Sequence, residues 1–281
     1  MRKINVQELI PAVKKLCIEA NYYIGNDIIT KLQEMAAREK SATAREVLAI
    51  LLKNHQLAAQ NMMPLCQDTG TAVIFVELGQ EIHLTGGDFT EALNEGVRQG
   101  YEAGYLRKSI VNDPVFDRIN TRDNTPAIIY MEIVPGNEIR ITVAPKGAGA
   151  ENMSDLKMLK PADGIEGVIN FVVDVVSRAG SNPCPPVIVG VGLGGNFEYS
   201  ALLAKKALLR PLNQTNPIAK WAKLEADILK KINNLGIGPQ GLGGRTTALG
   251  VNIQAEPCHI ASLPVAVNIQ CHAARCKSLV L

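Results

Sequence analysis

The sequence predicts an α+β protein, with a mixed β-sheet, surrounding helices and a helical N-terminal portion. Apolar residues up to about residue 60 recur at intervals of three and four, which is the spacing of one helix face. Short apolar runs of two kinds follow. Residues 139–143 alternate apolar and polar side chains, as in a strand with one exposed face, whereas residues 187–191 are apolar throughout, as in a strand buried on both faces.

The helical portion begins at residues 6–20, where Leu9, Val13 and Leu16 lie on one predicted helix face. Ser41, in "SATARE", is a residue type that caps helix N-termini, so it predicts the start of the next helix. Further helices are predicted at residues 89–105, 164–179, 198–209 and 216–233.

The predicted strands are bounded by glycine, proline and polar residues. They cover residues 71–76, 127–133, 139–144, 186–191, 251–254 and 265–270. No strand is predicted after residue 270. No internal repeat or low-complexity linker interrupts the sequence. We therefore assign residues 1–281 to one domain, with a helical portion over about 1–60 and an α+β portion over about 61–281.

The composition excludes several classes of protein. A net charge of +2 is too small to indicate a nucleic-acid or membrane partner. The N-terminus has no apolar core of a signal peptide, and no apolar stretch approaches the ~18 residues that span a bilayer. A cytoplasmic protein is expected, and its six cysteines are then expected to be reduced.

The stretch "VIVGVGLGG" holds Gly190, Gly192 and Gly195 in the order of a dinucleotide-binding fingerprint. That fingerprint also requires an acidic residue about twenty positions on, and "LLRPLNQTNP" supplies none. Two alternatives remain open: the glycines let a helix pack closely on the sheet, or free backbone N–H groups at a helix start bind a small anion.

Cys66, Cys184 and Cys271 each lie in a loop at a predicted strand boundary, unlike Cys17, which lies within a helix. Three such thiolates, if they converge, are one short of the four that hold a 4Fe-4S cluster. The remaining iron would be open to a substrate oxygen as a Lewis acid. Burial as small hydrophobic residues is the alternative for each cysteine. A zinc site around His259 is disfavoured, because the spacing of its neighbouring cysteines fits no standard site.

Six stretches together resemble one family. They are "PLCQDTGTA", "NTRDNTPA", "KGAGAENMS", "NPCPPVIVGVGLGG", "LGIGPQGLGG" and "CHIASLPVAVNIQCHAAR". In this order they resemble the alpha subunit, or N-terminal domain, of class I iron–sulfur fumarate hydratases and related hydro-lyases. The L(+)-tartrate dehydratase alpha subunit shares this plan. The loop that begins at Lys146 is similar to the fumarase form, so the resemblance implies reversible hydration of fumarate to L-malate, with tartrate or mesaconate as alternative substrates.

The resemblance also implies a set of site residues. The cluster ligands fall on Cys66, Cys184 and Cys271, while no such role falls on the other three cysteines. Asp68, two residues from a ligand, is the expected base that removes the C3 proton, with a turn or helix cap as its alternative role. The remaining implied residues are Gln67, Arg107 and Gly149, which would bind substrate, and His259, which would contact the substrate pocket and contribute to catalysis.

The resemblance implies a partner as well. Two arginines, a threonine and a lysine of the family's active site come from a second domain, here expected as a separate beta subunit in a heterotetramer with two copies of each chain. This chain alone is then expected to be inactive. Two other classes of function remain as alternatives: an oxidoreductase that uses the Gly190–Gly195 segment, and a binding subunit that has lost its cluster.

Overall fold

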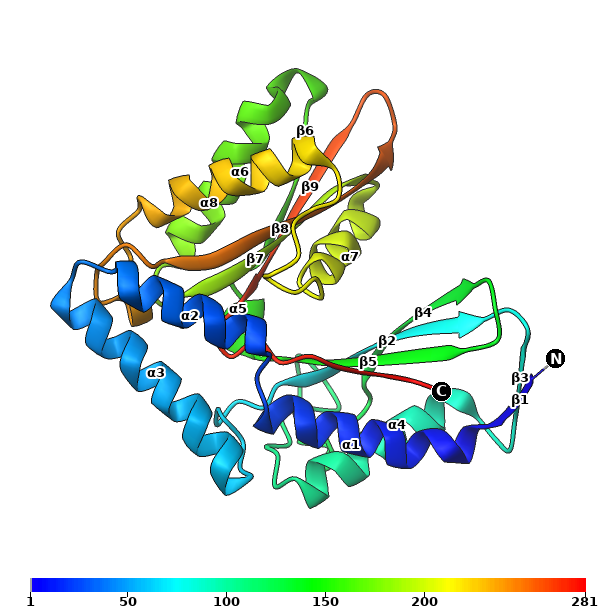
Figure 1. The fold of residues 1–281 in the computed structure, drawn as a ribbon. Coiled ribbons are helices and arrows are strands. Elements are labelled where there is room, and N and C mark those ends of the chain that lie inside the picture. The colour runs from blue at the N-terminus through cyan, green and yellow to red at the C-terminus, as the bar shows by residue number, and fades with distance from the viewer. Residues whose placement is uncertain (1) are drawn as a thin grey trace. The chain divides into compact units, whose positions relative to one another are not determined.

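A computed structural model describes residues 2–281 (Figure 1). The chain forms two compact units. The first unit comprises the described residues up to 24 together with residues 54–148 and 275–281, and the second comprises residues 25–53 and 149–274. Within residues 2–281, no helix combines the length and apolar character needed to cross a membrane.

Three helices dominate the first 61 residues, and strands and helices of both units follow. The helices are α1 (Leu9–Tyr22), α2 (Asn26–Arg38), α3 (Ala42–Asn61), α4 (Phe89–Ala103), α5 (Ala148–Glu151), α6 (Gly164–Ala179), α7 (Phe197–Ala207) and α8 (Ala219–Asn233), with short 3-10 turns η1 (Val6–Glu8), η2 (Pro161–Asp163) and η3 (Pro239–Gly241). The strands are β1 (Arg2–Asn5), β2 (Thr71–Gly79), β3 (Ile82–Thr85), β4 (Ile128–Val134), β5 (Ile139–Lys146), β6 (Asp155–Leu159), β7 (Val187–Gly195), β8 (Ala248–Cys258), β9 (Leu263–Gln270) and β10 (Lys277–Val280).

The first unit is a four-stranded mixed sheet in the order β10-β5-β2-β4, with β1 and β3 as a separate parallel pair. Strand β2 runs parallel to β4 and antiparallel to β5. Helices α1 and α4 pack together along one face of this sheet (Figure 1). Gly96 and Gly100 of α4 permit the contact, because a Cβ at either position would lie under 3.0 Å from a side chain of α1.

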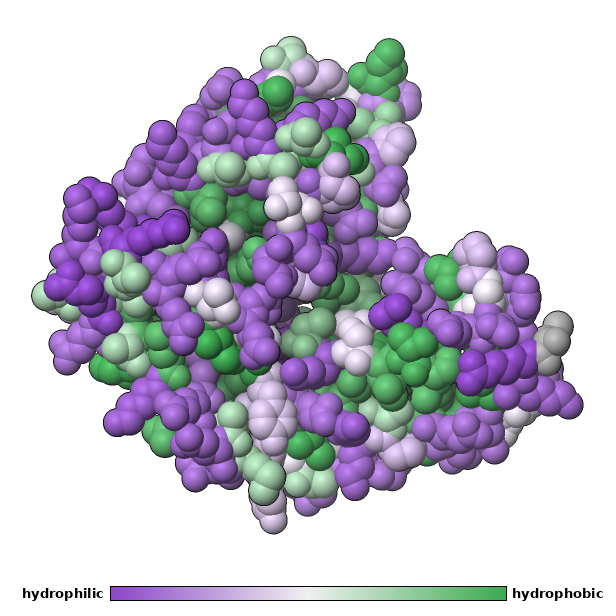
Figure 2. Space-filling model, in the orientation of Figure 1, coloured by the Kyte–Doolittle hydropathy of each residue, from purple (hydrophilic) through white to green (hydrophobic). Residues whose placement is uncertain are grey.

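The second unit is a four-stranded sheet in the order β6-β9-β7-β8 with helices on both faces. Alternate residues of β7, from Val187 to Leu193, join a core with α6 and α8. The outer surfaces of α6 and α8 are mostly hydrophilic, as expected for helices that cover one face of a sheet (Figure 2). The intervening Gly190 and Gly192 face α7, where an added Cβ would lie 2.1 Å and 2.0 Å from carbonyl oxygens of that helix.

The predicted fold class is confirmed: the sheets are mixed and the N-terminal segment is helical. The helix predicted at residues 164–179 has the observed bounds of α6, and Ser41 accepts a hydrogen bond from the Ala44 N–H at the start of α3. The prediction of no strand after residue 270 is wrong, because β10 pairs antiparallel with β5. The assignment of residues 1–281 to one domain stays a prediction.

Glu39 links the turn between α2 and α3 to the segment that leads into β8. One carboxylate oxygen accepts the N–H groups of Lys40 and Ser41 at 2.8 Å and 3.2 Å. The other accepts the N–H groups of Arg245 and Thr246 and the Thr246 hydroxyl, at 2.8, 3.1 and 2.9 Å. Burial disfavours the charged form, but the hydrogen bonds from Ser41, Thr246 and Arg245 outweigh it and hold the pKa of Glu39 below its ordinary value.

We expect Glu39 to make the stability of the chain pH-dependent. A carboxyl whose pKa is lowered by folding contributes stability above its ordinary pKa of 4.5 and loses it as the pH falls through the lower folded value. Glu39→Gln should therefore cost about 2 kcal/mol in the free energy of unfolding at pH 7, and less below pH 4.5. Urea unfolding at several pH values measures this. Glu46→Gln, at an exposed position of α3, is the matched control, and an equal loss in both variants would contradict the role of Glu39.

Candidate functional site

Residues 65–70, here called the Cys66 turn, lie between α3 and β2 and are held from several sides. The Leu65 N–H donates to the Asn21 carbonyl at 3.1 Å, and the Asn54 side chain donates to the Leu65 carbonyl at 2.9 Å. At the other end, the buried Tyr101 hydroxyl donates to the Gly70 carbonyl at 2.8 Å. The Cys66 thiol itself is half-buried. The backbone is thus fixed while the thiol remains accessible.

Asp68 lies at the centre of the turn with both carboxylate oxygens bonded to backbone N–H groups. Oδ1 accepts from Gly70 at 3.0 Å, and Oδ2 accepts from Ala148, the first residue of α5, at 2.8 Å. A Cβ at Gly147 would lie 3.1 Å from Oδ2, so glycine there permits this approach. The alternative role of Asp68 as a turn and cap residue is therefore present in the structure. It fixes the carboxylate and leaves lone pairs on both oxygens for a further ligand.

The turn is also connected to the segment that carries Arg107. The buried Thr69 hydroxyl donates to the Arg107 carbonyl at 3.1 Å. The fully buried Asn124 accepts the Ser109 N–H at 2.7 Å and donates to the Gly70 carbonyl at 3.2 Å. Three sequence-predicted residues, Gln67, Asp68 and Arg107, therefore share one region of the first unit. Sequence reasoning did not single out Asn124, although it lies in the motif "NTRDNTPA".

In the second unit, Cys184 and Cys271 lie at the same end of one sheet. Cys184 precedes β7 and Cys271 follows β9, and these strands are antiparallel neighbours with Ile188 opposite Gln270. Cys184 is exposed and Cys271 half-buried. Two cysteines that are 87 positions apart in the sequence are therefore brought to one edge by strand pairing. We call this edge the cysteine end of the sheet.

The glycine-rich loop before β8 supports the Cys184 segment. Gln240 donates twice to the Pro185 carbonyl, from its backbone N–H at 2.7 Å and from its side-chain amide at 2.8 Å. Gln240 has a φ of 53°, in the left-handed region that glycine normally occupies. This loop therefore holds the residue next to Cys184.

Gly149 also lies at the cysteine end, because β6 begins there. Asp155, the first residue of β6, pairs with Val267 of β9, and the Ser154 hydroxyl oxygen accepts the Ile269 N–H at 3.1 Å. Gly149 is exposed, within α5. Its backbone is therefore accessible near two of the predicted cluster ligands within this unit.

His259 is placed differently from the other predicted residues. It lies in the turn between β8 and β9, so the full length of β9 separates it from Cys271. Eight residues of strand correspond to roughly 25 Å. His259 instead lines an apolar hollow of about 440 Å³ with side chains of α6, α8 and the β8–β9 turn, among them Ile165, Trp221, Leu224 and Leu263. Within the second unit it is not brought to the cysteine end, and its catalytic role stays a prediction.

The dinucleotide alternative fails on strand geometry. Gly190 and Gly192 lie inside β7, where Gly190 pairs with Asn252 on one side and Asn268 on the other. Their backbones belong to the sheet and cannot form a phosphate-binding loop. The Asn196 side chain caps α7 by accepting the Tyr199 N–H, which also argues against the anion site. The remaining alternative, close packing of a helix on the sheet, is what the structure shows.

The cysteines differ in their surroundings. Burial raises the pKa of the Cys17 thiol to about 12, so Cys17 stays neutral inside the first unit and is a poor ligand. The Cys258 thiol, on the last residue of β8, donates to the Ser262 carbonyl at 3.3 Å. Among residues 2–281, no three histidine, cysteine, aspartate or glutamate side chains are grouped so as to hold a metal ion. Ligation by Cys66, Cys184 and Cys271 therefore remains a prediction.

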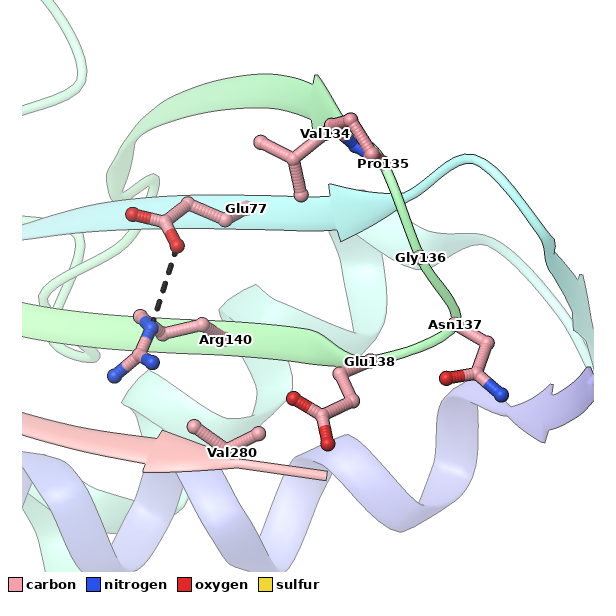
Figure 3. A pocket seen from close by; sticks show the side chains of 8 residues that line it. All are labelled: Glu77, Val134, Pro135, Gly136, Asn137, Glu138, Arg140 and Val280. Atoms are coloured by element: carbon pink, nitrogen blue, oxygen red, sulfur yellow. Dashed lines mark ion pairs between the residues drawn. The ribbon is translucent and has the colours of Figure 1, made fainter.

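A further hollow, of about 270 Å³, lies in the first unit beside the connection from β4 to β5 (Figure 3). Glu77 and Arg140, on neighbouring strands, point toward each other across it and form an ion pair at 3.3 Å. Because each side chain is about half exposed, the pair contributes little to stability. None of the sequence-predicted site residues lines this hollow.

Comparison with known proteins agrees with the resemblance of the motifs. A relative from Methanocaldococcus jannaschii, provisionally named an L(+)-tartrate dehydratase subunit alpha, is 42% identical over 267 residues, which cover 94% of each chain. L(+)-tartrate dehydratase subunits alpha of Escherichia coli strain K12 and Shigella sonnei are each 35% identical over 260 residues, which cover 91% of this chain and 85% of theirs. The family model described as fumarate hydratase (Fumerase) matches residues 10–280. The chain therefore belongs to the fumarate hydratase (Fumerase) family.

Proposed function

We propose that this chain is the alpha subunit of an iron–sulfur hydro-lyase that removes water from a hydroxylated C4 dicarboxylate. The observation that carries the proposal is the fixed carboxylate of Asp68, held by two backbone N–H groups two residues from an accessible thiol. A carboxylate so placed is a candidate general base beside a candidate cluster ligand. Membership of the fumarate hydratase family supports this class of reaction.

The donor set fits a 4Fe-4S cluster with one open iron. Cys66, Cys184 and Cys271 all follow or precede strands in loops, and none of them is buried. Cys184 and Cys271 share one end of a sheet, and hydrogen bonds to neighbouring backbone hold the segments of Cys66 and Cys184. When bound, such a cluster supplies a Lewis acid that makes a substrate hydroxyl a better leaving group.

The residues of this chain would provide binding and proton transfer. The Arg107 guanidinium suits a substrate carboxylate, which it can bind through two parallel N–H groups. The Gln67 amide and the Gly149 N–H would each donate to a substrate oxygen. A carboxylate oxygen of Asp68 would take the proton from carbon, the C–H electrons would form the new double bond, and the hydroxide that leaves the next carbon would receive that proton from Asp68 and depart as water. The mechanism uses no step at His259, because of its place at the far end of the second unit.

The preferred substrate is proposed to be L(+)-tartrate rather than fumarate or mesaconate. The loop from Lys146 to Asn152 suggested the fumarase form, but the relatives reported above are named as L(+)-tartrate dehydratase subunits. Tartrate differs from malate by a hydroxyl on the carbon that loses the proton. Loss of water from tartrate then gives an enol, which becomes a keto acid, and the reaction needs no different base.

A beta subunit is proposed as the partner, because the relatives are named as subunits alpha. The chain should then be inactive alone, even with its cluster reconstituted. We expect an anaerobically co-expressed alpha–beta complex to dehydrate L(+)-tartrate with a kcat/KM at least about tenfold above that for malate or for mesaconate hydration. Assays of the three substrates side by side measure this. A preference for fumarate and malate would restore the fumarase assignment, and turnover by the alpha chain alone would contradict the need for a partner.

Replacement of one predicted ligand should remove the cluster. We expect Cys184→Ala to lower the iron and sulfide content of the anaerobically purified complex from about four per alpha chain to near zero. Cys258→Ala is the matched control, since Cys258 is also exposed and ends β8 in the same unit, at the other end of the sheet. Equal iron content in the two variants would exclude Cys184 as a ligand.

Asp68→Asn should separate proton transfer from cluster assembly. The amide keeps the shape of the carboxylate but cannot accept the proton, so kcat should fall by about 10²–10⁴-fold. Asparagine can accept only one of the two backbone N–H bonds of Asp68, so iron content is measured in parallel, and a fall in kcat at wild-type iron content assigns the loss to proton transfer. Asp227→Asn, on the exposed face of α8, is the control with the same chemical change. Retention of kcat in Asp68→Asn would transfer the role of base to another group.

A further inference from the structure

Arg275 is a buried charged residue to which the proposed reaction assigns no role. It lies between Cys271 and β10, belongs to the first unit, and is only 3% exposed. A buried charge is costly unless hydrogen bonds compensate it, so the partners of Arg275 indicate what it does. Its Nη1 donates to the Asp68 carbonyl oxygen at 2.7 Å and to the Asn21 Oδ1 at 3.1 Å.

Asn21 connects the same guanidinium to the other side of Cys66. Asn21 is fully buried near the end of α1, and its side-chain amide donates to the Cys17 carbonyl at 2.9 Å, which fixes the side chain on its own helix. Its backbone carbonyl accepts the Leu65 N–H at 3.1 Å. Arg275 therefore holds Asp68 directly and is bonded to the residue that holds Leu65, so its contacts flank Cys66 on both sides.

Gly147 shows that the guanidinium also approaches the Asp68 side chain. A Cβ built at Gly147 would lie 3.1 Å from Asp68 Oδ2 and 3.4 Å from Arg275 Nη2. The guanidinium and the carboxylate thus both border this position, which has no side chain. Arginine suits this place because its planar group carries several N–H donors in fixed directions, whereas lysine offers a single ammonium.

We propose that Arg275 is a positioning residue, which holds the Cys66 turn so that the thiol of Cys66 and the carboxylate of Asp68 keep a fixed spacing. Its effect on catalysis rests on the proposed function, but its effect on the turn does not. Without the guanidinium, the Asp68 carbonyl and the Asn21 side chain each lose a buried donor. The turn would then be held at its ends by Asn54 and Tyr101 and by the Asp68 carboxylate, but the Asp68 carbonyl would lack the donor that fixes it.

The first test measures the turn in the full chain without metal. We expect Arg275→Met to speed amide hydrogen exchange in peptides that cover residues 65–70 by at least about tenfold, since each lost bond involves a charged donor. Arg275→Lys keeps the charge but has a single donor nitrogen. The exchange rate of residues 65–70 in this variant should therefore lie between the rates in Arg275→Met and the wild type. Tyr22→Phe, which removes a buried hydrogen bond to the Gly104 carbonyl in the same unit, is the control and should leave these peptides unchanged.

The proposal is supported if amide exchange becomes faster only in residues 65–70, and more so in Arg275→Met than in Arg275→Lys. Unchanged exchange there, or an increase spread evenly over the first unit in all three variants, overturns it. If Arg275→Met does not fold, Arg275→Lys still decides, because a positioning role requires faster local exchange in it than in Tyr22→Phe.

The second test uses the alpha–beta complex and separates this inference from the proposed function. Displacement of a catalytic group by about 1 Å can cost about 10²-fold in rate, so Arg275→Lys should lower kcat by about 10–100-fold while KM changes less than about threefold. A change confined to KM would overturn the catalytic part of the inference. If the wild-type complex shows no hydro-lyase activity, the proposed function fails, whereas the exchange result still stands.

Discussion

The two hydrogen bonds of the Asp68 carboxylate are the constraint on which the rest of the first unit's candidate site depends. They join the turn before β2 to the first residue of α5, just beyond β5, at the point where Thr71 of β2 pairs with Lys146 of β5. The sheet register therefore brings the two segments together, and the carboxylate locks them. Cys66 and Gln67 directly precede the locked Asp68, and the neighbouring Thr69 hydroxyl holds the Arg107 backbone.

In the second unit, strand pairing and loop contacts place the predicted ligand residues. Strand pairing brings Cys184 and Cys271 to one edge of the sheet, and contacts from a distant loop then fix the Cys184 segment. Glu39 anchors the far end of that loop through Arg245 and Thr246. Glycines also contribute, because Gly190 and Gly192 let α7 pack closely on the sheet. The predicted ligand loops are thus supported by ordinary packing and hydrogen bonds.

The reaction chemistry explains why a family described as fumarate hydratase includes relatives named for tartrate. Both reactions remove a proton from the carbon beside a carboxylate and a hydroxyl from the next carbon. They differ only in the substituent on the carbon that loses the proton. A single base could serve either substrate, so selectivity must lie in the groups that contact that substituent. The motif around Cys66 therefore indicates the reaction class more strongly than the substrate.

The sequence by itself determined the fold class, most of the helices and strands, and which loops carry reactive residues. Those features depend on local spacing of apolar and polar side chains, as the bounds of α6 illustrate. Only the tertiary structure decided that β7 continues through Gly192 to Gly195, that His259 lies far from Cys271, and that Arg275 is buried against Asp68. These outcomes depend on pairing and burial between residues distant in the chain, which no local pattern records.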